Sequence, residues 1–304
     1  MSYHIVTIDS PKAHLNCVNG QFVCTTDEGR RSLPLEDISA IIVCCFSAKI
    51  ELRLLTEAAK LGIGLILCET YTPAAIVLPA MRSTDTALTR AWQKASPETL
   101  AAIWSATIDA KCANQTALAA AWNPLHPSLP QMQEALPRSF PVKEAVVSKL
   151  YWHAFRDWVG CSDFARLRGE GLPNHCLDYG YAVLLARVLQ LCYACGLDPT
   201  FGIGHETAER ATPLAYDLME PFRPLVDARV ADWLRRSGIP DELDKAFKQH
   251  LLAFLETPVP YRKASKPFQF VLESVVRSFR AALLENNPSL YVPWTAGNSK
   301  WAGC

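Results

Sequence analysis

The order of apolar and polar residues divides the chain near residue 86. The part before it contains short alternating runs bounded by turn residues, a pattern that predicts β-strands. Asn19-Gly20 separates two such runs within 15–24, which is the sequence signature of a type I′ hairpin. The apolar, β-branched run at 38–46 is typical of a strand covered on both faces. A helix at 49–61 and a further strand at 61–69 complete this part.

Helical spacing replaces the strand pattern after residue 86. Segments rich in Ala, Leu and Gln have apolar residues three or four positions apart. The predicted helices lie at 87–122, 142–159 and 178–196, and the chain to about 285 is again helical. Five prolines at 123–141 indicate a long connection or a broken helix. We expect irregular structure at 161–175 and an irregular, exposed tail after 285.

These patterns predict an α+β protein with a β-rich domain at 1–85 and a larger all-helical domain at 86–304. A chain of 304 residues is long enough for two domains. Half of its residues are apolar and a fifth are charged, which is the balance of a folded globular protein rather than a disordered one.

Charge and hydropathy restrict the classes of function. The formal net charge is zero, so binding to DNA would require the basic residues to cluster on one surface. The first residues lack the pattern of a secretory signal. The longest apolar stretch, 181–197, is interrupted by Arg187 and Gln190, and it is shorter than the roughly 18 uninterrupted residues of a membrane span. We therefore expect a soluble, cytoplasmic protein.

The chain contains eleven cysteines. Without a secretion signal, we expect them to be reduced, and several lie in apolar runs where a thiol packs as a small apolar group. Cys192 and Cys195 form a C-x-x-C pair inside a helical pattern. A zinc site there, with His175 and Cys176, is the less favoured interpretation because a second matched pair is missing.

The segment 201–224 allows two interpretations. Asp217 and Glu220 have the spacing of a capping box, with Asp217 as the N-cap and Glu220 at the third helical position. Residues three apart on a helix also share a face, so the same carboxylates could bind one ion together with His205. Carboxylates with one imidazole suit Mg²⁺ or Mn²⁺. The spacing alone does not separate the two.

A metal site of this kind would need a further carboxylate from elsewhere in the chain. Glu144, in the first turn of the predicted helix at 142–159, is a candidate. A glutamate in that position commonly does no more than interact with the helix dipole. No spacing argument connects Glu144 to His205.

Four ordered segments resemble the CRISPR-associated adaptation integrase family (Cas-one). They are EAVVSKLYW (144–152), LDYGYAVLLARVL (177–189), GLDPTFGIGH (196–205) and YDLMEPFRP (216–224). PLEDISAIIV (34–43) resembles the N-terminal domain of that family, so the resemblance extends over nearly the whole chain. The chain departs from the usual family pattern at Asp178, where asparagine is common, at Val146 and Val147, and between His205 and Asp217, where asparagines are common.

The resemblance implies a β-sandwich-like N-terminal domain that dimerises, followed by an all-α catalytic domain. It implies that Glu144, His205 and Glu220 are catalytic and bind Mg²⁺ or Mn²⁺, with Asp217 as an auxiliary acidic partner. The implied activity is that of a metal-dependent DNA endonuclease and integrase, which inserts short duplex DNA (spacers) into a repeat array by 3′-hydroxyl transesterification. The implied partners are double-stranded DNA, a second copy of the chain and the small protein Cas-two.

Basic residues cluster in two places that suit this activity. One cluster surrounds the helix of Glu144, and the other lies at 261–270, where Arg and Lys alternate with Tyr and Phe, a composition suited to phosphate contact and base stacking. A solvated charged surface is the alternative interpretation. The candidate DNA-binding residues are Lys149, Arg166, Arg168, Arg223, Arg262, Lys263 and Lys266.

Two other functions remain open at this stage. One is a stand-alone metal-dependent nuclease or transposase-like integrase that works outside CRISPR arrays. The other is a non-catalytic helical DNA-binding scaffold whose acidic residues only cap helices.

Overall fold

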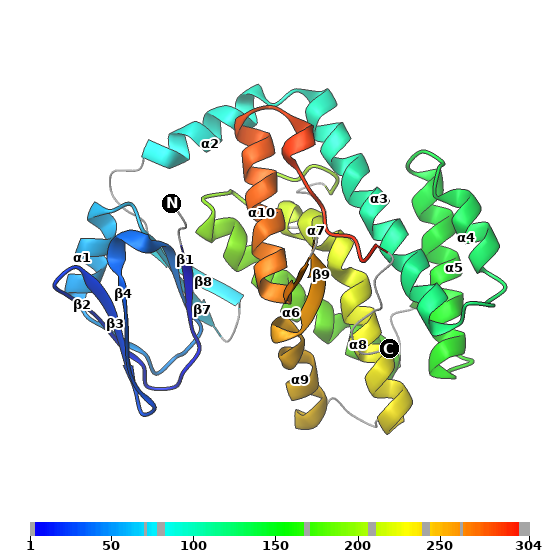
Figure 1. Ribbon diagram of the computed structural model, residues 1–304, viewed down its shortest axis with the longest axis horizontal. Coiled ribbons are helices and arrows are strands. Elements are labelled where there is room, and N and C mark those ends of the chain that lie inside the picture. Colours follow the sequence, from blue (N-terminus) through cyan, green and yellow to red (C-terminus); the bar gives the residue numbers. More distant parts are fainter. Residues whose placement is uncertain are drawn as a thin grey trace.

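The computed structural model describes residues 4–69, 72–77, 83–166, 171–205, 211–238, 244–261 and 264–297. Figure 1 shows a β-rich lobe, formed by the N-terminal part of the chain, beside a larger lobe of helices. This arrangement agrees with the predicted α+β class. No helix in the described parts of the chain is both long enough and apolar enough to cross a membrane.

The described residues of the N-terminal lobe form two sheets, one α-helix and a short 3-10 helix. One sheet has the strand order β1-β5-β7-β8, in which β1, β5 and β7 are parallel and β8 is antiparallel to β7. The other has the order β4-β3-β2-β6. The elements are β1 (His4–Ile8), β2 (His14–Val18), β3 (Gln21–Thr26), β4 (Gly29–Pro34), η1 (Leu35–Asp37), β5 (Ile38–Val43), β6 (Lys49–Ile50), α1 (Leu52–Lys60), β7 (Gly64–Glu69) and β8 (Thr72–Val77).

The local predictions in this lobe are largely confirmed. Asn19 and Gly20 connect β2 to β3 with φ of 49° and 73°, and a type I′ turn requires both values to be positive. Strand β5 is covered on both faces: Ile41 belongs to the core shared with the second sheet, and Ile42 belongs to a smaller cluster beside α6 (Leu172–Ala194). The predicted helix at 49–61 is shorter than expected because its first two residues pair with β2 as strand β6.

The helical lobe begins at Ser83. Its elements are α2 (Ser83–Lys94), α3 (Pro97–Trp122), α4 (Leu129–Ala135), α5 (Val142–Val159), α6, α7 (Pro213–Met219), η3 (Glu220–Phe222), α8 (Arg223–Ser237), α9 (Lys245–Leu252), η4 (Ala253–Glu256), β9 (Pro258–Tyr261), β10 (Ala264–Pro267), α10 (Phe268–Leu284) and η5 (Pro288–Leu290). The predicted helix at 87–122 is two helices. Ser96 caps the second of them by accepting a hydrogen bond from the Thr99 amide at 3.1 Å, and Pro97 follows at the first helical position.

Two predictions for this lobe are wrong. The domain is not entirely helical, because β9 and β10 form an antiparallel pair inside the segment expected to be helical. Helix α6 begins at Leu172, six residues before the expected start, because Pro173 fits its first turn.

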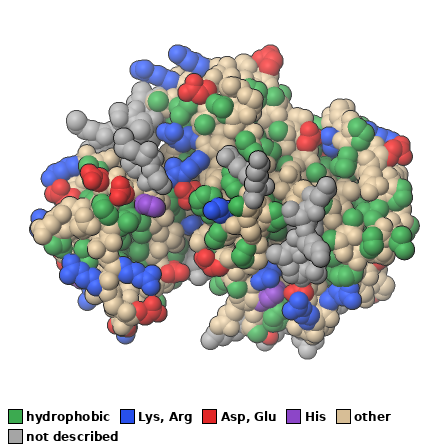
Figure 2. All heavy atoms as spheres, in the orientation of Figure 1, with side chains coloured by type: hydrophobic (Ala, Val, Ile, Leu, Met, Phe, Trp, Pro, Cys, Tyr) green, Lys and Arg blue, Asp and Glu red, His purple; other side chains and the backbone are tan. Residues whose placement is uncertain are grey.

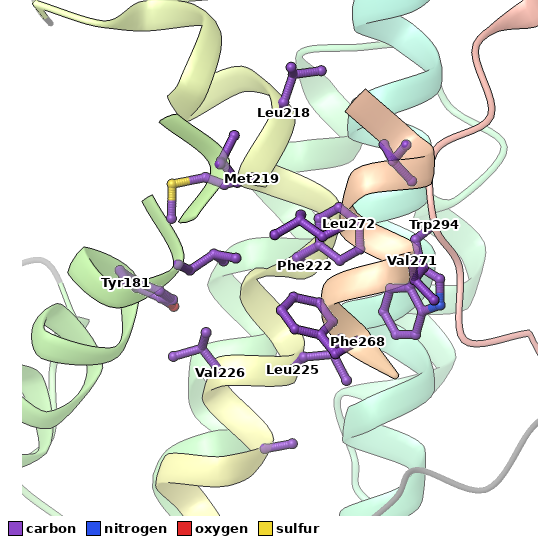
Figure 3. Close-up of a cluster of buried hydrophobic side chains, with 14 of the residues drawn as sticks. Tyr181, Leu218, Met219, Phe222, Leu225, Val226, Phe268, Val271, Leu272 and Trp294 are labelled. Atoms are coloured by element: carbon purple, nitrogen blue, oxygen red, sulfur yellow. The ribbon is translucent and has the colours of Figure 1, made fainter. Parts of the chain in front are cut away.

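The tail is irregular, as predicted, but it is not uniformly exposed. Tyr291 and Trp294 are buried. Trp294 stacks on Phe222 with ring centroids 5.8 Å apart, and its indole nitrogen donates a hydrogen bond to the Pro260 carbonyl at 2.7 Å. Figure 3 shows Trp294 beside the apolar side chains that α8 and α10 contribute to the core. The large apolar area of this tryptophan therefore fixes the tail to the helical lobe.

Candidate active site

Glu144 and Glu220 meet around a lysine that the sequence analysis did not select. Glu144 lies in the first turn of α5, and Glu220 begins η3, directly after α7. The ammonium of Lys111, from the middle of α3, is 2.6 Å from Glu144 Oε1 and 2.6 Å from Glu220 Oε2. Two carboxylates that are 76 residues apart in the chain are therefore within reach of one cation.

Glu220 is almost completely buried, with 4 % of its side chain exposed. Arg223 Nε lies 2.7 Å from its other oxygen, Oε1. Burial opposes the charged form of Glu220, but Arg223 and Lys111 outweigh that effect and lower its pKa to about 2. The contacts of Glu220 with Lys111 and with Arg223 are ion pairs whose angles do not suit a hydrogen bond. Glu220 Oε2 and Arg223 Nε are therefore buried without a hydrogen-bond partner among the described residues.

Asp217 holds the loop that carries His205. Its side chain is fully buried, and its two oxygens accept four N–H groups. Oδ2 accepts from the backbone of Ile203 at 2.6 Å and of Gly204 at 3.1 Å, while Oδ1 accepts from the His205 backbone at 3.0 Å and from His205 Nδ1 at 2.7 Å. Because a carboxylate only accepts, Nδ1 carries the proton and the neutral ring has its lone pair on Nε2. This hydrogen bond also raises the pKa of His205.

The capping-box interpretation of this segment is wrong. Asp217 lies within α7, near its C-terminal end, and its side chain bonds to the preceding loop. Thr212 and Phe222, which precede α7 and α8, form no side-chain cap. Both oxygens of Asp217 already accept hydrogen bonds from residues 203–205. Asp217 is therefore better suited to positioning His205 than to binding a metal.

Two glycines allow this loop to pass close to its neighbours. A Cβ atom at Gly204 would lie 2.3 Å from the ring of Trp104, and one at Gly202 would lie 2.2 Å from the His205 carbonyl oxygen. The Trp104 ring also meets the His205 ring edge-on, with centroids 5.8 Å apart. Both glycines are therefore required by close contact rather than by a positive φ.

A second buried carboxylate lies behind the site. Asp227, in α8, accepts hydrogen bonds from Tyr151 Oη at 2.7 Å and from Tyr181 Oη at 2.5 Å. The Arg223 guanidinium lies 4.7 Å from the centre of the Tyr181 ring. Burial raises the pKa of Asp227 to about 6, although both tyrosines favour its charged form.

The stability of Asp227→Asn, measured relative to the unchanged protein, is expected to be higher at pH 8 than at pH 4.5. The raised folded-state pKa contributes stability below the unfolded value near 4, and this contribution is lost as pH rises through 6. The asparagine of the variant has no carboxyl group, so its side chain does not titrate between pH 4 and 6. The difference between the two proteins should therefore shift by about 2 kcal/mol between the two pH values, because part of the contribution is already lost at pH 4.5. Urea unfolding at both pH values measures this shift, and a difference that does not change with pH would contradict it.

The predicted DNA-binding residues fall into three groups. Lys149 and Lys266 are exposed. Arg166 and Arg223 bind other side chains of the chain: Arg166 pairs with Asp178 at 2.5 Å, and Arg223 pairs with Glu220. Arg168, Arg262 and Lys263 lie outside the described residues. Figure 2 shows basic and acidic side chains interspersed over the visible face, which agrees with a net charge of zero.

Comparison with known proteins identifies the family. A family model described as CRISPR associated protein Cas1 matches residues 6–252. The chain belongs to the Cas1 family. A curated relative, the CRISPR-associated endonuclease Cas1 of Neisseria meningitidis serogroup C, is 27 % identical over 261 residues, which is 84 % of each chain. This Cas1 chain is accordingly an enzyme of the CRISPR-associated endonuclease class.

Solved structures share the Cas1 fold. A structure titled as a casposase bound to integration product superposes with a TM-score of 0.70 and 20 % identity, covering 93 % of this chain and 96 % of that one. A structure titled as a partial Cas6-RT-Cas1–Cas2 complex gives a TM-score of 0.72 and 15 % identity, covering 97 % and 99 %. A β-rich region followed by a mostly helical part is thus the Cas1 architecture.

Cas1 enzymes are typically metal-dependent. Among the described residues, no group of three or more His, Cys, Asp or Glu side chains is spaced to hold a metal, and the buried pair Cys192 and Cys195 does not form such a group either. The carboxylate oxygens of Glu144 and Glu220 nevertheless suit a divalent ion. Two carboxylates converge on a cation, the ammonium of Lys111, and Glu220 Oε2 is a buried acceptor without a hydrogen bond.

Proposed function

We propose that this Cas1 enzyme joins the 3′ ends of short duplex DNA to a CRISPR repeat by transesterification. The observation that carries the proposal is the convergence of Glu144 and Glu220 on one cation, beside a loop that fixes His205. The casposase named above, which is bound to its integration product, supports the same class of reaction. A scaffold whose acidic residues only cap helices is disfavoured, since Asp217 and Glu220 cap no helix through their side chains.

The proposed ligands of a divalent ion are Glu144, Glu220 and His205 through Nε2. When bound, Mg²⁺ or Mn²⁺ supplies Lewis acidity to the attacked phosphate and neutralises the charge that develops on its oxygens. Asp217 acts one step away: it keeps the proton on His205 Nδ1 and so leaves the Nε2 lone pair for the ion. Arg223 keeps Glu220 ionised.

The reaction needs no nucleophile from the protein. The oxygen of the substrate's 3′-hydroxyl forms a new bond to the target phosphorus, and the bond from that phosphorus to the 3′ oxygen of the repeat strand breaks. The proton lost by the attacking hydroxyl is balanced by the one gained by the released 3′ oxygen. Because water can replace the hydroxyl, the same site would also cleave DNA.

The proposed partners are double-stranded DNA, a second copy of the chain and Cas2. Structures titled as a Cas1–DNA complex and as complexes of Cas1 with Cas2 support these assignments. We propose that the β-rich lobe at 1–85 forms the dimer. Lys149 and Lys266, which are exposed, are the described residues best placed to contact phosphates, whereas Arg166 and Arg223 are engaged within the chain.

An integration assay tests this function. A labelled duplex and a supercoiled plasmid carrying a CRISPR repeat are incubated with the protein, with and without Cas2, in Mn²⁺, Mg²⁺ or EDTA. We expect covalent joining at the repeat with either metal and none in EDTA. Joining in EDTA would refute the metal site. Equal joining to a plasmid that lacks the repeat, in the presence of Cas2, would favour a transposase-like integrase instead.

A further inference from the structure

Lys111 occupies an unusual position for a lysine. Only 13 % of its side chain is exposed, and its ammonium donates a hydrogen bond to Glu144 and makes an ion pair with Glu220, each at 2.6 Å. The two partners come from α5 and η3, whereas Lys111 comes from α3. One ammonium therefore bridges the carboxylates that the proposed function assigns to a divalent ion.

The charges of this cluster are already balanced. Lys111 and Arg223 carry two positive charges, and Glu144 and Glu220 carry two negative charges. Arg223 approaches Glu220 Oε1, whereas Lys111 approaches Oε2, so each oxygen of Glu220 faces a cation. A divalent ion added to this arrangement would be repelled by both cations.

We propose that Lys111 is a built-in competitor of the metal, which holds Glu144 and Glu220 together until a divalent ion displaces its ammonium. The inference rests on the proposed function, since it takes Glu144 and Glu220 as the metal ligands. Without a cation between them, the two carboxylates would repel each other across a partly buried site. The long, flexible stem of a lysine allows its charge to move while its backbone stays within α3.

This role has two consequences that differ from those of an ordinary structural ion pair. Removal of the Lys111 charge should strengthen metal binding, because the ion no longer has to displace a competitor. The same removal should lower the stability of the metal-free protein, because the two carboxylates are then left without their shared cation. A lysine that merely supported the fold would change stability without improving metal affinity.

Lys111→Met tests the inference, because methionine retains an unbranched side chain without the charge. Lys143→Met is a matched control: Lys143 also connects α3 and α5, through an ion pair with Asp109 at 2.5 Å, and its side chain is 10 % exposed. Isothermal titration of the full chain with MnCl₂ after removal of EDTA measures affinity. We expect Lys111→Met to bind Mn²⁺ at least about tenfold more tightly, and Lys143→Met to remain within about twofold of the unchanged protein.

Thermal melting provides the second measurement. In EDTA, Lys111→Met should have a lower Tm than the unchanged protein, and Mn²⁺ should raise its Tm by a larger increment. Mn²⁺ affinity that is unchanged or weaker in Lys111→Met would overturn the inference. Glu220→Gln separates the two proposals: if it binds Mn²⁺ normally, the proposed metal site fails, whereas if it loses Mn²⁺ while Lys111→Met is unchanged, only the role of Lys111 fails.

The unaltered protein offers a test that does not depend on the folding of a variant. Reductive methylation with isotope-labelled formaldehyde, read by mass spectrometry, reports the reactivity of individual lysine amines. Lys111 should react slowly in EDTA and faster in Mn²⁺, while the rate at Lys143 should not change. Equal rates at Lys111 in both conditions would overturn the inference.

Discussion

Glu220→Gln is expected to reduce the joining of labelled duplex DNA to a repeat plasmid by about a thousandfold. A divalent ion contributes several kcal/mol of transition-state stabilisation, and the loss of about 4 kcal/mol lowers a rate by roughly that factor. The amide has nearly the shape of the carboxylate but no charge, so it is a poor ligand for Mg²⁺ or Mn²⁺. The integration assay measures the rate, and titration with MnCl₂ measures the accompanying loss of metal binding.

The same substitution also affects stability, and the sign follows from the pKa. The pKa of Glu220 is lowered to about 2 in the folded protein, so its charge contributes stability above the unfolded value near 4.5, and that stability is lost as pH falls through 2. At pH 7 the contribution is about 3 kcal/mol at most. The variant also leaves Lys111 and Arg223 with one carboxylate fewer, so a lower Tm is expected.

Glu273→Gln is the matched control for this experiment. Glu273 also pairs with an arginine, Arg277, at 2.7 Å, but it lies in α10 and has no contact with Glu144, Glu220 or Lys111 in the described structure. It should retain nearly full joining activity. If Glu220→Gln is folded at the assay temperature and keeps more than a tenth of the activity, Glu220 is not a metal ligand.

Periodicity and turn chemistry predicted the elements whose cause is local. The Asn19-Gly20 hairpin, the doubly covered strand β5 and helix α5 with Glu144 in its first turn all follow from short stretches of sequence. The β9–β10 pair and the buried Trp294 do not. Their conformations depend on packing against α10 and Phe222, which no local pattern contains.

The residues of the candidate site follow from the sequence only in part, for the same physical reason. His205 and Glu220 came from one segment, and Glu144 required the family resemblance. Lys111 was missed because one lysine in a long helix normally indicates an exposed face, and its burial becomes evident only when α3 packs on α5 and η3. The capping-box prediction is wrong because the Asp217 side chain accepts hydrogen bonds from the preceding residues 203–205, and not from the first turn of a following helix.

Asp217→Asn is expected to reduce DNA joining by at least about a hundredfold, although Asp217 is not proposed to touch the metal or DNA. The asparagine amide has one acceptor oxygen and a donor group, whereas the native carboxylate accepts four N–H groups with two oxygens. If the amide donates to His205 Nδ1, the ring proton moves to Nε2, which then cannot bind a metal. The backbone N–H of His205 then also loses its acceptor, so a loss of about 1–3 kcal/mol in stability is expected.

The pKa of His205 distinguishes this positioning role from simple destabilisation. The hydrogen bond from His205 to Asp217 raises that pKa, so in Asp217→Asn it should fall toward or below its ordinary value. NMR titration of the imidazole in EDTA, on folded protein at low temperature, measures the change. Asp198→Asn is the control, because Asp198 accepts the Thr200 amide at 2.9 Å in the same connection before α7. A His205 pKa that is unchanged in Asp217→Asn would show that this carboxylate does not hold the ring, and the proposed ligand geometry at Nε2 would lose its basis.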